Sequence, residues 1–282
     1  MSEATTFTDS HAVTVRGESL LLTWGAVTHV GRKRDVNQDS VMGEFPLFAV
    51  ADGMGGYAAG ELASAAVVTQ FAELARSGEP ITHDRLEAAL RDAIVALADE
   101  DDIDVGTGTT VTGIAVTTTE DEPFWTVFNI GDSRVYVERE GELAQVTTDH
   151  SVVQELIAIG AISPDDAENH PQGNVITRAV GFTEDPVPDY LQMPIEKGTR
   201  WVICSDGLTK ELTDYGILHF LERGPDPLDA ANLMVEAAVE NGGRDNVTVL
   251  IVDVDDADGG REEDAGADSD ADSAADDSSS TA

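Results

Sequence analysis

Positive charge is scarce in this sequence. The 282 residues include 55 Asp and Glu but only 16 Lys and Arg, a formal net charge of −39, and the only lysines are Lys33, Lys197 and Lys210. With no basic stripe to neutralise phosphates, nucleic acid is excluded as the main ligand. An evenly acidic, lysine-poor surface is typical of halophilic proteins that work in near-saturating salt, where charges are screened over about 3 Å at ~1 M. The alternative is an acidic patch made for a basic partner.

Cysteine and long apolar runs are nearly absent as well. Cys204 is the only cysteine, so no internal disulfide can form and a reducing compartment is natural. No window of about 18 apolar residues exists that could cross a membrane. Residues 1–10 are polar and have no apolar run after a basic start, unlike a signal peptide. We therefore expect a soluble, cytoplasmic protein that is a monomer.

Composition divides the chain into three parts. Residues 1–18 are interpreted as a polar leader, and residues 19–254 as one globular domain without internal repeats. Residues 255–282 contain eleven acidic residues, one arginine and otherwise mostly Ala, Ser and Gly. Such a segment cannot bury enough apolar area to offset the entropy of ordering, so it is predicted to be a disordered tail.

The order of the expected elements favours one fold class. Helices are expected over 59–76, 85–98, 151–160 and 226–241, with Thr82 and Ser151 as N-caps of the second and third. Apolar and β-branched runs predict strands over 20–28, 47–52, 109–118, 124–130, 134–140, 200–205 and 246–254. Strands in consecutive runs, with helices in pairs, indicate an α+β protein with antiparallel sheets covered by helices rather than a doubly wound parallel sheet.

Aspartates stand at the ends of four apolar strands. Asp52 and Asp206 each follow a strand and precede a glycine, Asp132 lies in a tight turn between two strands, and Asp245 comes just before the last strand. A single Asp-Gly after a strand is usually a turn. Four carboxylates that converge on one edge of a fold must instead be protonated or bind cations. Hard oxygen ligands of this kind suit Mg²⁺ or Mn²⁺.

Eight ordered motifs extend this pattern over about residues 20 to 254. They are GRKRDVNQDS (31–40), FAVADGMGG (48–56), GTT (108–110), NIGDSRVY (129–136), TTDHS (147–151), VITRAVG (175–181), VICSDGL (202–208) and GGRDNVTV (242–249). In these motifs and their order the chain resembles the metal-dependent, type 2C protein serine/threonine phosphatases of the bacterial type. The resemblance implies a four-layer α-β-β-α sandwich, in which two antiparallel sheets are flanked by helices.

The resemblance also implies a site that binds two or three Mn²⁺ or Mg²⁺ ions. Asp52 would bridge two ions and position the nucleophilic water, and the carbonyl of Gly53 would bind one of them. Asp206 and Asp245 would also bind ions, and Asp39 would bind through water. Asp132 together with Asp206 would form a third-ion site, and Arg34 would bind the substrate phosphate. A guanidinium fits phosphate oxygens bidentately, as an ammonium cannot.

The implied reaction is hydrolysis of phosphoserine and phosphothreonine in proteins by in-line attack of a metal-bridging hydroxide. Two ions about 4 Å apart can ionise water at neutral pH and neutralise the charge that develops on the phosphate. The partners would be phosphoprotein substrates and a cognate Ser/Thr kinase in the same signalling system. A weakly catalytic module that binds phosphoproteins and a phosphatase for small metabolites remain as alternatives.

Four residues depart from the family pattern or lack a role. Gln38 stands where many members have glutamate, which puts metal affinity there in question, and Met54 stands where some members have a histidine proposed as general acid. His29 has no assigned role, and His150 is interpreted as a structural turn residue. The segment 152–175 matches the family's mobile flap.

Two other site types are set aside. Cys204 lies in an apolar strand and is followed six positions later by Lys210 rather than by the arginine of a cysteine-dependent phosphatase. The acidic segment 99–104 lacks the glycine and terminal glutamate of a calcium loop and is predicted to be a solvated loop.

Overall fold

Two antiparallel sheets, packed face to face, form the centre of the molecule. The computed structural model describes residues 4–55, 59–98, 107–119, 122–167 and 170–257. The strand order in the first sheet is β1 (Thr5–Val15), β2 (Glu18–His29), β12 (Val247–Asp256), β11 (Thr199–Cys204), β8 (Arg134–Arg139) and β9 (Glu142–Gln145). The order in the second is β10 (Asp189–Pro194), β7 (Glu122–Ile130), β6 (Val111–Thr119), β4 (Leu47–Met54) and β3 (Asp39–Glu44), with β5 (Gly108–Thr109) beside β4.

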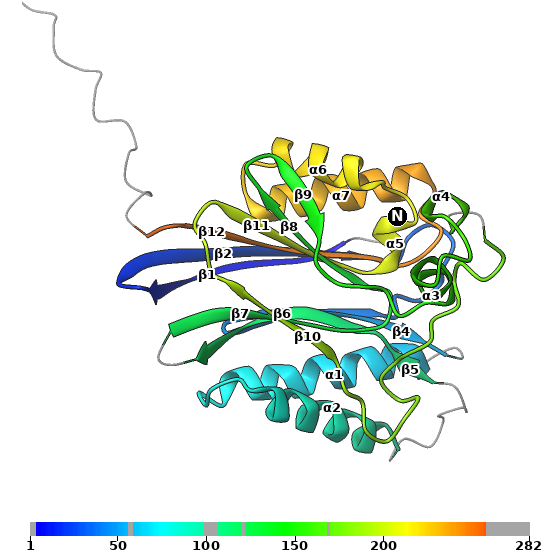
Figure 1. Ribbon diagram of the computed structural model, residues 1–282, viewed down its shortest axis with the longest axis horizontal. Helices are drawn as coiled ribbons and strands as arrows, with labels where there is room; N and C mark the ends of the chain where they lie inside the picture. The colour runs from blue at the N-terminus through cyan, green and yellow to red at the C-terminus, as the bar shows by residue number, and fades with distance from the viewer. Residues whose placement is uncertain (1–3, 56–58, 99–106, 120–121, 168–169, 258–282) are drawn as a thin grey trace, which may run out of the picture.

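Helices cover both outer faces of the pair of sheets (Figure 1). α1 (Ala59–Arg76) and α2 (His83–Ala98) lie on the second sheet, and α6 (Asp214–Arg223) and α7 (Pro227–Asn241) lie on the first. The short helices α3 (Val152–Ala158), α4 (Pro164–Ala167) and α5 (Asp206–Thr209) gather at one end of the sandwich. The predicted α-β-β-α architecture is confirmed.

Three apolar layers hold the sandwich together. The middle layer, between the sheets, contains a chain of ring contacts in which Phe48 lies 5.0 Å from Trp24 and 6.1 Å from Trp125 between ring centroids. The other two layers lie under α1 and α2 and under α5 to α7. Because β12 lies between two of these layers, its first eight residues are all buried. Asp245, just before β12, is therefore attached to a firmly packed element.

Most of the predicted elements are present with nearly the predicted bounds. α1 spans the predicted 59–76, and α2 follows Thr82, whose hydroxyl accepts from the Arg85 N–H at 3.3 Å. Ser151 caps α3 in the same way, by accepting from the Gln154 N–H. No residue of α3 is buried, however, and its C-cap Ile159 is 78% exposed.

The predicted leader is wrong as an assignment for residues 5–15. These residues form β1, which pairs with β2 along its whole length, from Thr5 opposite Thr28 to Val15 opposite Glu18. Backbone hydrogen bonds do not require apolar side chains, and an edge strand needs only one face covered. Phe7 and Val13 supply that face by packing against the middle apolar layer.

The predicted start of the tail at residue 255 is also too early. β12 continues to Asp256, with Asp255 opposite Leu21 and Asp256 opposite Leu20, and the Ala257 N–H donates to the carbonyl of Ser19. A charged side chain is tolerated there because the strand has passed the end of the apolar layers. The rest of the predicted tail, residues 258–282, and the acidic segment 99–104 lie outside the described residues.

Candidate metal centre

One end of the sandwich collects the predicted site residues from both sheets. Asp52 lies near the end of β4, directly opposite Asp39 at the start of β3. Asp206 follows β11, and Asp245 precedes β12. Because these strands are antiparallel, the end of one and the start of its neighbour meet at the same edge. The topology therefore brings together carboxylates that are far apart in the sequence.

Asp39 is the most deeply buried member of this cluster, with 7% of its surface exposed. Its Oδ2 accepts hydrogen bonds from the hydroxyls of Ser205 at 2.8 Å and Thr248 at 2.7 Å. The Ser205 Oγ in turn accepts from the Thr248 N–H at 3.0 Å. Asp39 is thus fixed to β11 and β12 of the opposite sheet, across the end of the sandwich.

The turn that carries Asp132 connects β7 of one sheet with β8 of the other. The Thr110 hydroxyl accepts from the Asp52 N–H at 3.0 Å and lies 2.8 Å from the Ser133 hydroxyl. His150, buried beneath the turn, accepts from the Gly131 N–H at 3.0 Å through its Nδ1. These contacts hold Asp132 near Asp52, and they give His150 the structural role in a turn that the sequence indicates.

Lys210 contacts two of the carboxylates. Its Nζ lies 2.5 Å from Oδ2 of Asp206 and 3.0 Å from Oδ2 of Asp245. Asp206 opens α5 and Lys210 is its C-cap, so the two residues are four apart and share one face. Burial alone lowers the pKa of Lys210, but the charges of Asp206 and Asp245 raise it above the ordinary value.

Arg34 also contacts Asp245, with its Nη2 2.9 Å from Oδ1 and 3.0 Å from Oδ2. The loop that carries Arg34 is shaped by Asn246, whose Nδ2 donates to the carbonyls of Val30 and Val36. Arg34 is 49% exposed. A half-exposed guanidinium at the rim of a carboxylate cluster is suitably placed to meet an anion that enters from solvent.

Two glycines permit the close packing of the site. A Cβ on Gly53 would lie 2.0 Å from the carbonyl oxygen of Gly60, and one on Gly207 would lie 1.8 Å from that of Asn246. A side chain at Gly53 would push the segment that carries Asp52 away from Gly60, and one at Gly207 would push the segment that carries Asp206 away from Asn246. The glycines after the two motif aspartates are therefore required by space.

Crowding makes the ion-free cluster electrostatically unfavourable. Burial raises the pKa of Asp39 to about 7; the hydrogen bonds from Thr248 and Ser205 oppose this rise, and the charge of Asp206 adds to it. Burial and then the charge of Asp206 raise the pKa of Asp132 to about 7. Burial, followed by the charge of Asp39, raises the pKa of Asp52 well above its ordinary value. At neutral pH these carboxyls need protons or added cations.

The residues present fit divalent ions by their chemistry. Within the described residues, the Oδ1 atoms of Asp39 and Asp206 are buried and have no hydrogen-bond partner. Such orphaned oxygens are costly unless a cation meets them. In this same part of the chain, no three His, Cys, Asp or Glu side chains form a cage that could hold an ion as they stand. Two of the expected ligands, Asp206 and Asp245, are instead joined through Lys210.

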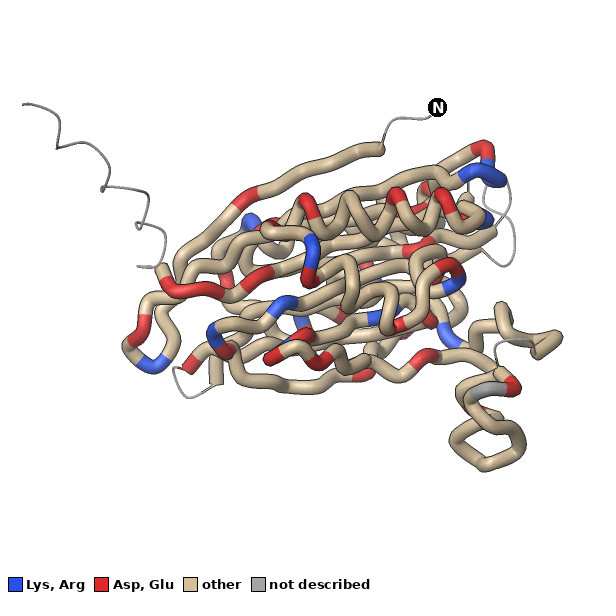
Figure 2. The backbone as a smooth tube through the Cα atoms, turned by 90° about the horizontal axis from the view of Figure 1, so that it is seen from above, with Lys and Arg blue, Asp and Glu red and all other residues tan. Residues whose placement is uncertain are grey.

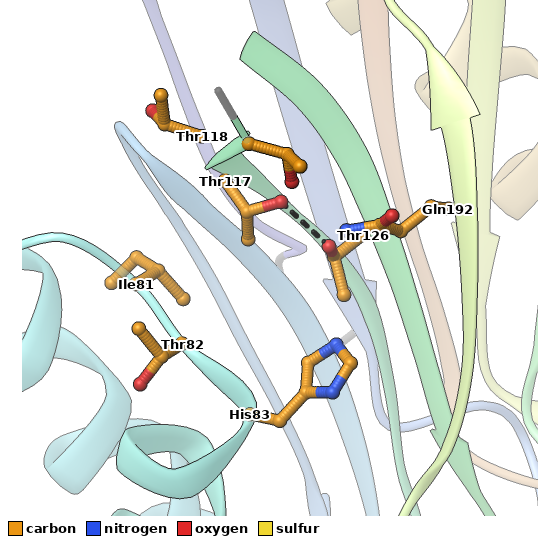
Figure 3. Close-up of a pocket in the computed structure, with 8 residues that line it drawn as sticks. Ile81, Thr82, His83, Thr117, Thr118, Thr126 and Gln192 are labelled. Carbon is orange, nitrogen blue, oxygen red and sulfur yellow. Dashed lines mark hydrogen bonds between the residues drawn. The ribbon is translucent and has the colours of Figure 1, made fainter. Parts of the chain in front are cut away.

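The small pocket drawn in Figure 3 lies away from this cluster. It is lined by residues before and at the start of α2, by the end of β6, and by Thr126 of β7 and Gln192 of β10. The hydroxyls of Thr117 and Thr126 lie 2.7 Å apart at its wall (Figure 3). None of the aspartates lines this pocket, so it has no part in the candidate site.

The sequence interpretation missed the residues that organise the cluster. Lys210, Ser205, Thr248, Thr110 and Asn246 all contact a predicted site residue or its loop. The i,i+4 spacing of Asp206 and Lys210 was the only local signal, since the other contacts join segments far apart in the chain. Of the residues without a role, His29 accepts from the Gly31 N–H through Nδ1, and Gln38 donates its N–H to Asn246 Oδ1.

Comparison with known proteins identifies relatives of this arrangement. A family model described as "Protein phosphatase 2C" matches residues 28–240. The chain is 38% identical over 249 residues to the serine/threonine protein phosphatase PstP of Mycobacterium tuberculosis. This alignment covers 86% of this chain and 47% of that protein. It is 33% identical over 242 residues to the serine/threonine phosphatase stp of Listeria monocytogenes. That alignment covers 81% of this chain and 94% of the Listeria protein.

A solved structure agrees with the sequence comparison. It is the catalytic domain of PstP in complex with two manganese ions, which matches with a TM-score of 0.74 and 37% identity over 84% of this chain and 100% of that one. Since the chain spans 47% of the whole mycobacterial protein, the correspondence is with that protein's catalytic part.

Proposed function

The chain belongs to the protein phosphatase 2C family, and from this membership we propose that it is a metal-dependent phosphatase that hydrolyses phosphoserine and phosphothreonine in proteins. The observation that carries the proposal is the carboxylate cluster at the sandwich end, with two buried oxygens that lack a hydrogen-bond partner among the described residues. The mycobacterial relative of similar fold was crystallised with two manganese ions.

Two or three Mn²⁺ or Mg²⁺ ions are proposed as the cofactors. Asp52, Asp206, Asp245 and the carbonyl of Gly53 would hold the first two, with Asp39 acting through water. Asp132 would join Asp206 at a third position. When bound, the ions supply a water of lowered pKa and positive charge beside the phosphate.

The chain's own residues then orient the reaction. Asp52 fixes the position of the attacking water, and Arg34 binds two phosphate oxygens so that phosphorus faces that water. The new bond to phosphorus forms as the bond to the serine or threonine oxygen breaks on the opposite side. Met54 cannot donate the proton that this oxygen needs, so in this chain the proton has to come from a bound water or from another residue.

One experiment tests the function and separates it from its alternatives. The full chain in concentrated potassium chloride is assayed with Mn²⁺ against an aryl phosphate, a phosphothreonine peptide and a sugar phosphate. We expect hydrolysis of the first two with the peptide favoured, and no hydrolysis after chelation. Preference for the sugar phosphate would indicate a metabolite phosphatase, and peptide binding without turnover would indicate a regulatory module.

The cellular setting is proposed from charge. Acidic residues are spread over the length of the backbone while basic residues are few (Figure 2), which supports work in the salt-rich cytoplasm of a halophile. A single buried cysteine suits a reducing compartment. The partners proposed are phosphoproteins and the Ser/Thr kinase that modifies them, in a signalling pair, with the enzyme acting as a monomer and without nucleic acid. Within the described residues, no helix is long and apolar enough to cross a bilayer.

A further inference from the structure

Lys210 has an unusual position among the few lysines of this chain. Lys33 is exposed, and Lys197 is an exposed partner of Asp256. Lys210 instead points into the candidate metal centre and contacts Oδ2 of both Asp206 and Asp245. An acidic chain that uses arginine for thirteen of its sixteen basic residues thus has a compact ammonium between two expected ion ligands.

The ammonium and a divalent ion need the same oxygens. An ammonium has three donors and no acceptor, so it cannot itself serve as an ion ligand. Both Asp245 oxygens already face side-chain cations, since the Arg34 Nη2 lies 2.9 Å from Oδ1 and 3.0 Å from Oδ2, and the Lys210 Nζ lies 3.0 Å from Oδ2. A divalent ion that took Oδ2 of Asp206 or Asp245 would meet the positive charge of Lys210 at contact distance.

We propose that Lys210 is an internal competitor for the divalent ions, which holds Asp206 and Asp245 while the protein is ion-free and leaves them when an ion binds. This proposal rests on the metal centre of the proposed function. The lysine sets how much ion is needed to load the site, because an ion that takes the oxygens of Asp206 and Asp245 must displace it. The side chain has room to leave, since it is 30% exposed and its four-carbon stem is flexible.

Calorimetric titration of Mn²⁺ into the full, chelator-stripped chain in concentrated potassium chloride tests the competition. Lys210→Met removes the charge and keeps the stem, and we expect about tenfold tighter Mn²⁺ binding at the weakest site, within the range typical of coupled ligands. Lys210→Arg keeps the charge and should bind Mn²⁺ nearly as the wild type does. Lys197→Met is the matched control and should change nothing.

A labelling experiment on the wild type covers the case in which Lys210→Met does not fold without ions. An amine-reactive reagent is applied with and without Mg²⁺, and each lysine is quantified by mass spectrometry. We expect labelling of Lys210 to rise severalfold when Mg²⁺ is added, while Lys197 stays constant as an internal reference. Unchanged labelling of Lys210, with Mg²⁺ binding shown separately, would overturn the proposal.

The outcomes distinguish the competitor role from the metal centre itself. If the wild type binds Mn²⁺ and Lys210→Met binds it equally or more weakly, Lys210 is no competitor, and the proposed phosphatase function is untouched. If neither protein binds Mn²⁺, the metal centre fails and the competitor role fails with it. Thermal melts in chelator should show Lys210→Met less stable than the wild type, and added Mn²⁺ should remove the difference; an equal loss with and without Mn²⁺ would indicate a merely structural lysine.

Discussion

Buried carboxylates lie near both ends of strands β11 and β12, and they differ in whether a side-chain cation pairs with them. At one end Asp253 lies opposite Arg200 in the strand register, and the Arg200 Nε donates to Asp253 Oδ1 at 2.9 Å. At the other end Asp39, Asp52 and Asp132 crowd together, and within the described residues none of these three has a side-chain cation within ion-pair distance. The same pair of strands thus supports a closed ion pair and an open acidic cluster.

The pair at the first end is neutralised within the fold, although the Arg200 Nη2 is buried without a hydrogen-bond partner among the described residues. Burial raises the pKa of Asp253 to about 6, and the hydrogen bond and charge of Arg200 oppose that rise. Arg200 also donates through Nη1 to the carbonyls of Leu221 and Gly224 at the end of α6. Arg200 therefore joins the sheet to a helix, and the Asp253 carboxylate holds the Arg200 guanidinium in this position.

The cluster at the second end is incomplete within the fold. Its carboxylates repel one another, and among the described residues Lys210 and Arg34 neutralise them only in part. The fold pairs a buried aspartate with arginine at the first end but supplies too few side-chain cations at the second. This difference is expected if divalent ions bind at the second end. The comparison predicts that matched substitutions at the two ends affect turnover and the free energy of unfolding of the ion-free protein in opposite ways.

The largest predicted effect is on turnover. Asp52→Asn should reduce Mn²⁺-dependent hydrolysis of an aryl phosphate by about 10³-fold or more, since it removes the carboxylate proposed to bridge the ions and to position the attacking water. Asp206→Asn should do the same. Asp253→Asn, assayed at a temperature where it stays folded, should keep most of the wild-type rate. Equal losses from Asp52→Asn and Asp253→Asn would mean that the two ends do not differ in function.

Stability should change in the opposite sense. Asp253→Asn leaves Arg200 without its buried partner and should lower the free energy of unfolding by about 3 kcal/mol, measured by urea denaturation. Circular dichroism of the native state checks that the fold is retained. A loss below about 0.5 kcal/mol would show that the pair contributes no more than a surface salt bridge does.

Removal of charge from the open cluster should stabilise the ion-free protein. At pH 8 in chelator, Asp52→Asn should raise the free energy of unfolding by about 1–2 kcal/mol, because a carboxylate with a raised pKa costs stability when it is ionised. With saturating Mn²⁺ the order should reverse, since only the wild type gains the binding energy of the ions. A variant less stable than the wild type in chelator would contradict this account of the cluster.

The raised pKa values also predict a pH dependence. Between the ordinary value of 3.8 and about 7, Asp39 and Asp132 bind more protons in the folded chain than in the unfolded one. The stability of the ion-free protein should therefore fall as the pH rises through this window, and Asp52, whose pKa is also raised, should add to the fall. Urea midpoints from pH 5 to 8 measure the slope, and the variant Asp39→Asn/Asp132→Asn should make it shallower, with Asp52 and Asp253 still contributing. An unchanged slope in that variant would assign the dependence to other groups.

A smaller effect is expected at the rim. Arg34→Lys keeps the charge but loses bidentate contact with phosphate, so kcat/KM for a phosphopeptide should fall by about tenfold. Arg244→Lys is the matched control, because Arg244 is exposed and pairs with Glu211. Calorimetry should give both variants the same number of bound Mn²⁺ ions as the wild type. If Arg34→Lys left the kinetics unchanged, a different residue would have to bind the phosphate.

The smallest effect is expected from truncation. Removal of residues 258–282 should leave turnover and Mn²⁺ stoichiometry unchanged, because β12 ends at Asp256 and its described contacts are made without these residues. Removal from residue 255 onward deletes two paired residues of β12 as well and should cost some stability. Activity measurements and thermal melts of both truncations, at matched salt, make the comparison.

Local patterns were sufficient for much of the fold and not for the internal order of the site. Apolar runs and caps located α1, α2, α7 and β12, since those elements bury apolar faces. β1 was missed because its hydrogen bonds to β2 leave little trace in side-chain polarity. The motif aspartates were recognisable at strand ends, but their contacts with Thr248, Thr110 and Lys210 depend on which strands become neighbours.

The central claim is that the open cluster takes its missing positive charge from divalent ions. A crystal soaked in Mn²⁺ in concentrated salt, with anomalous scattering recorded at the manganese edge, tests it most directly. The account predicts at least two manganese peaks bound by oxygens of Asp52, Asp206 and Asp245, with the Lys210 ammonium moved away from both Asp206 and Asp245. Absence of manganese from the cluster, with Lys210 still in contact with both aspartates, would contradict it.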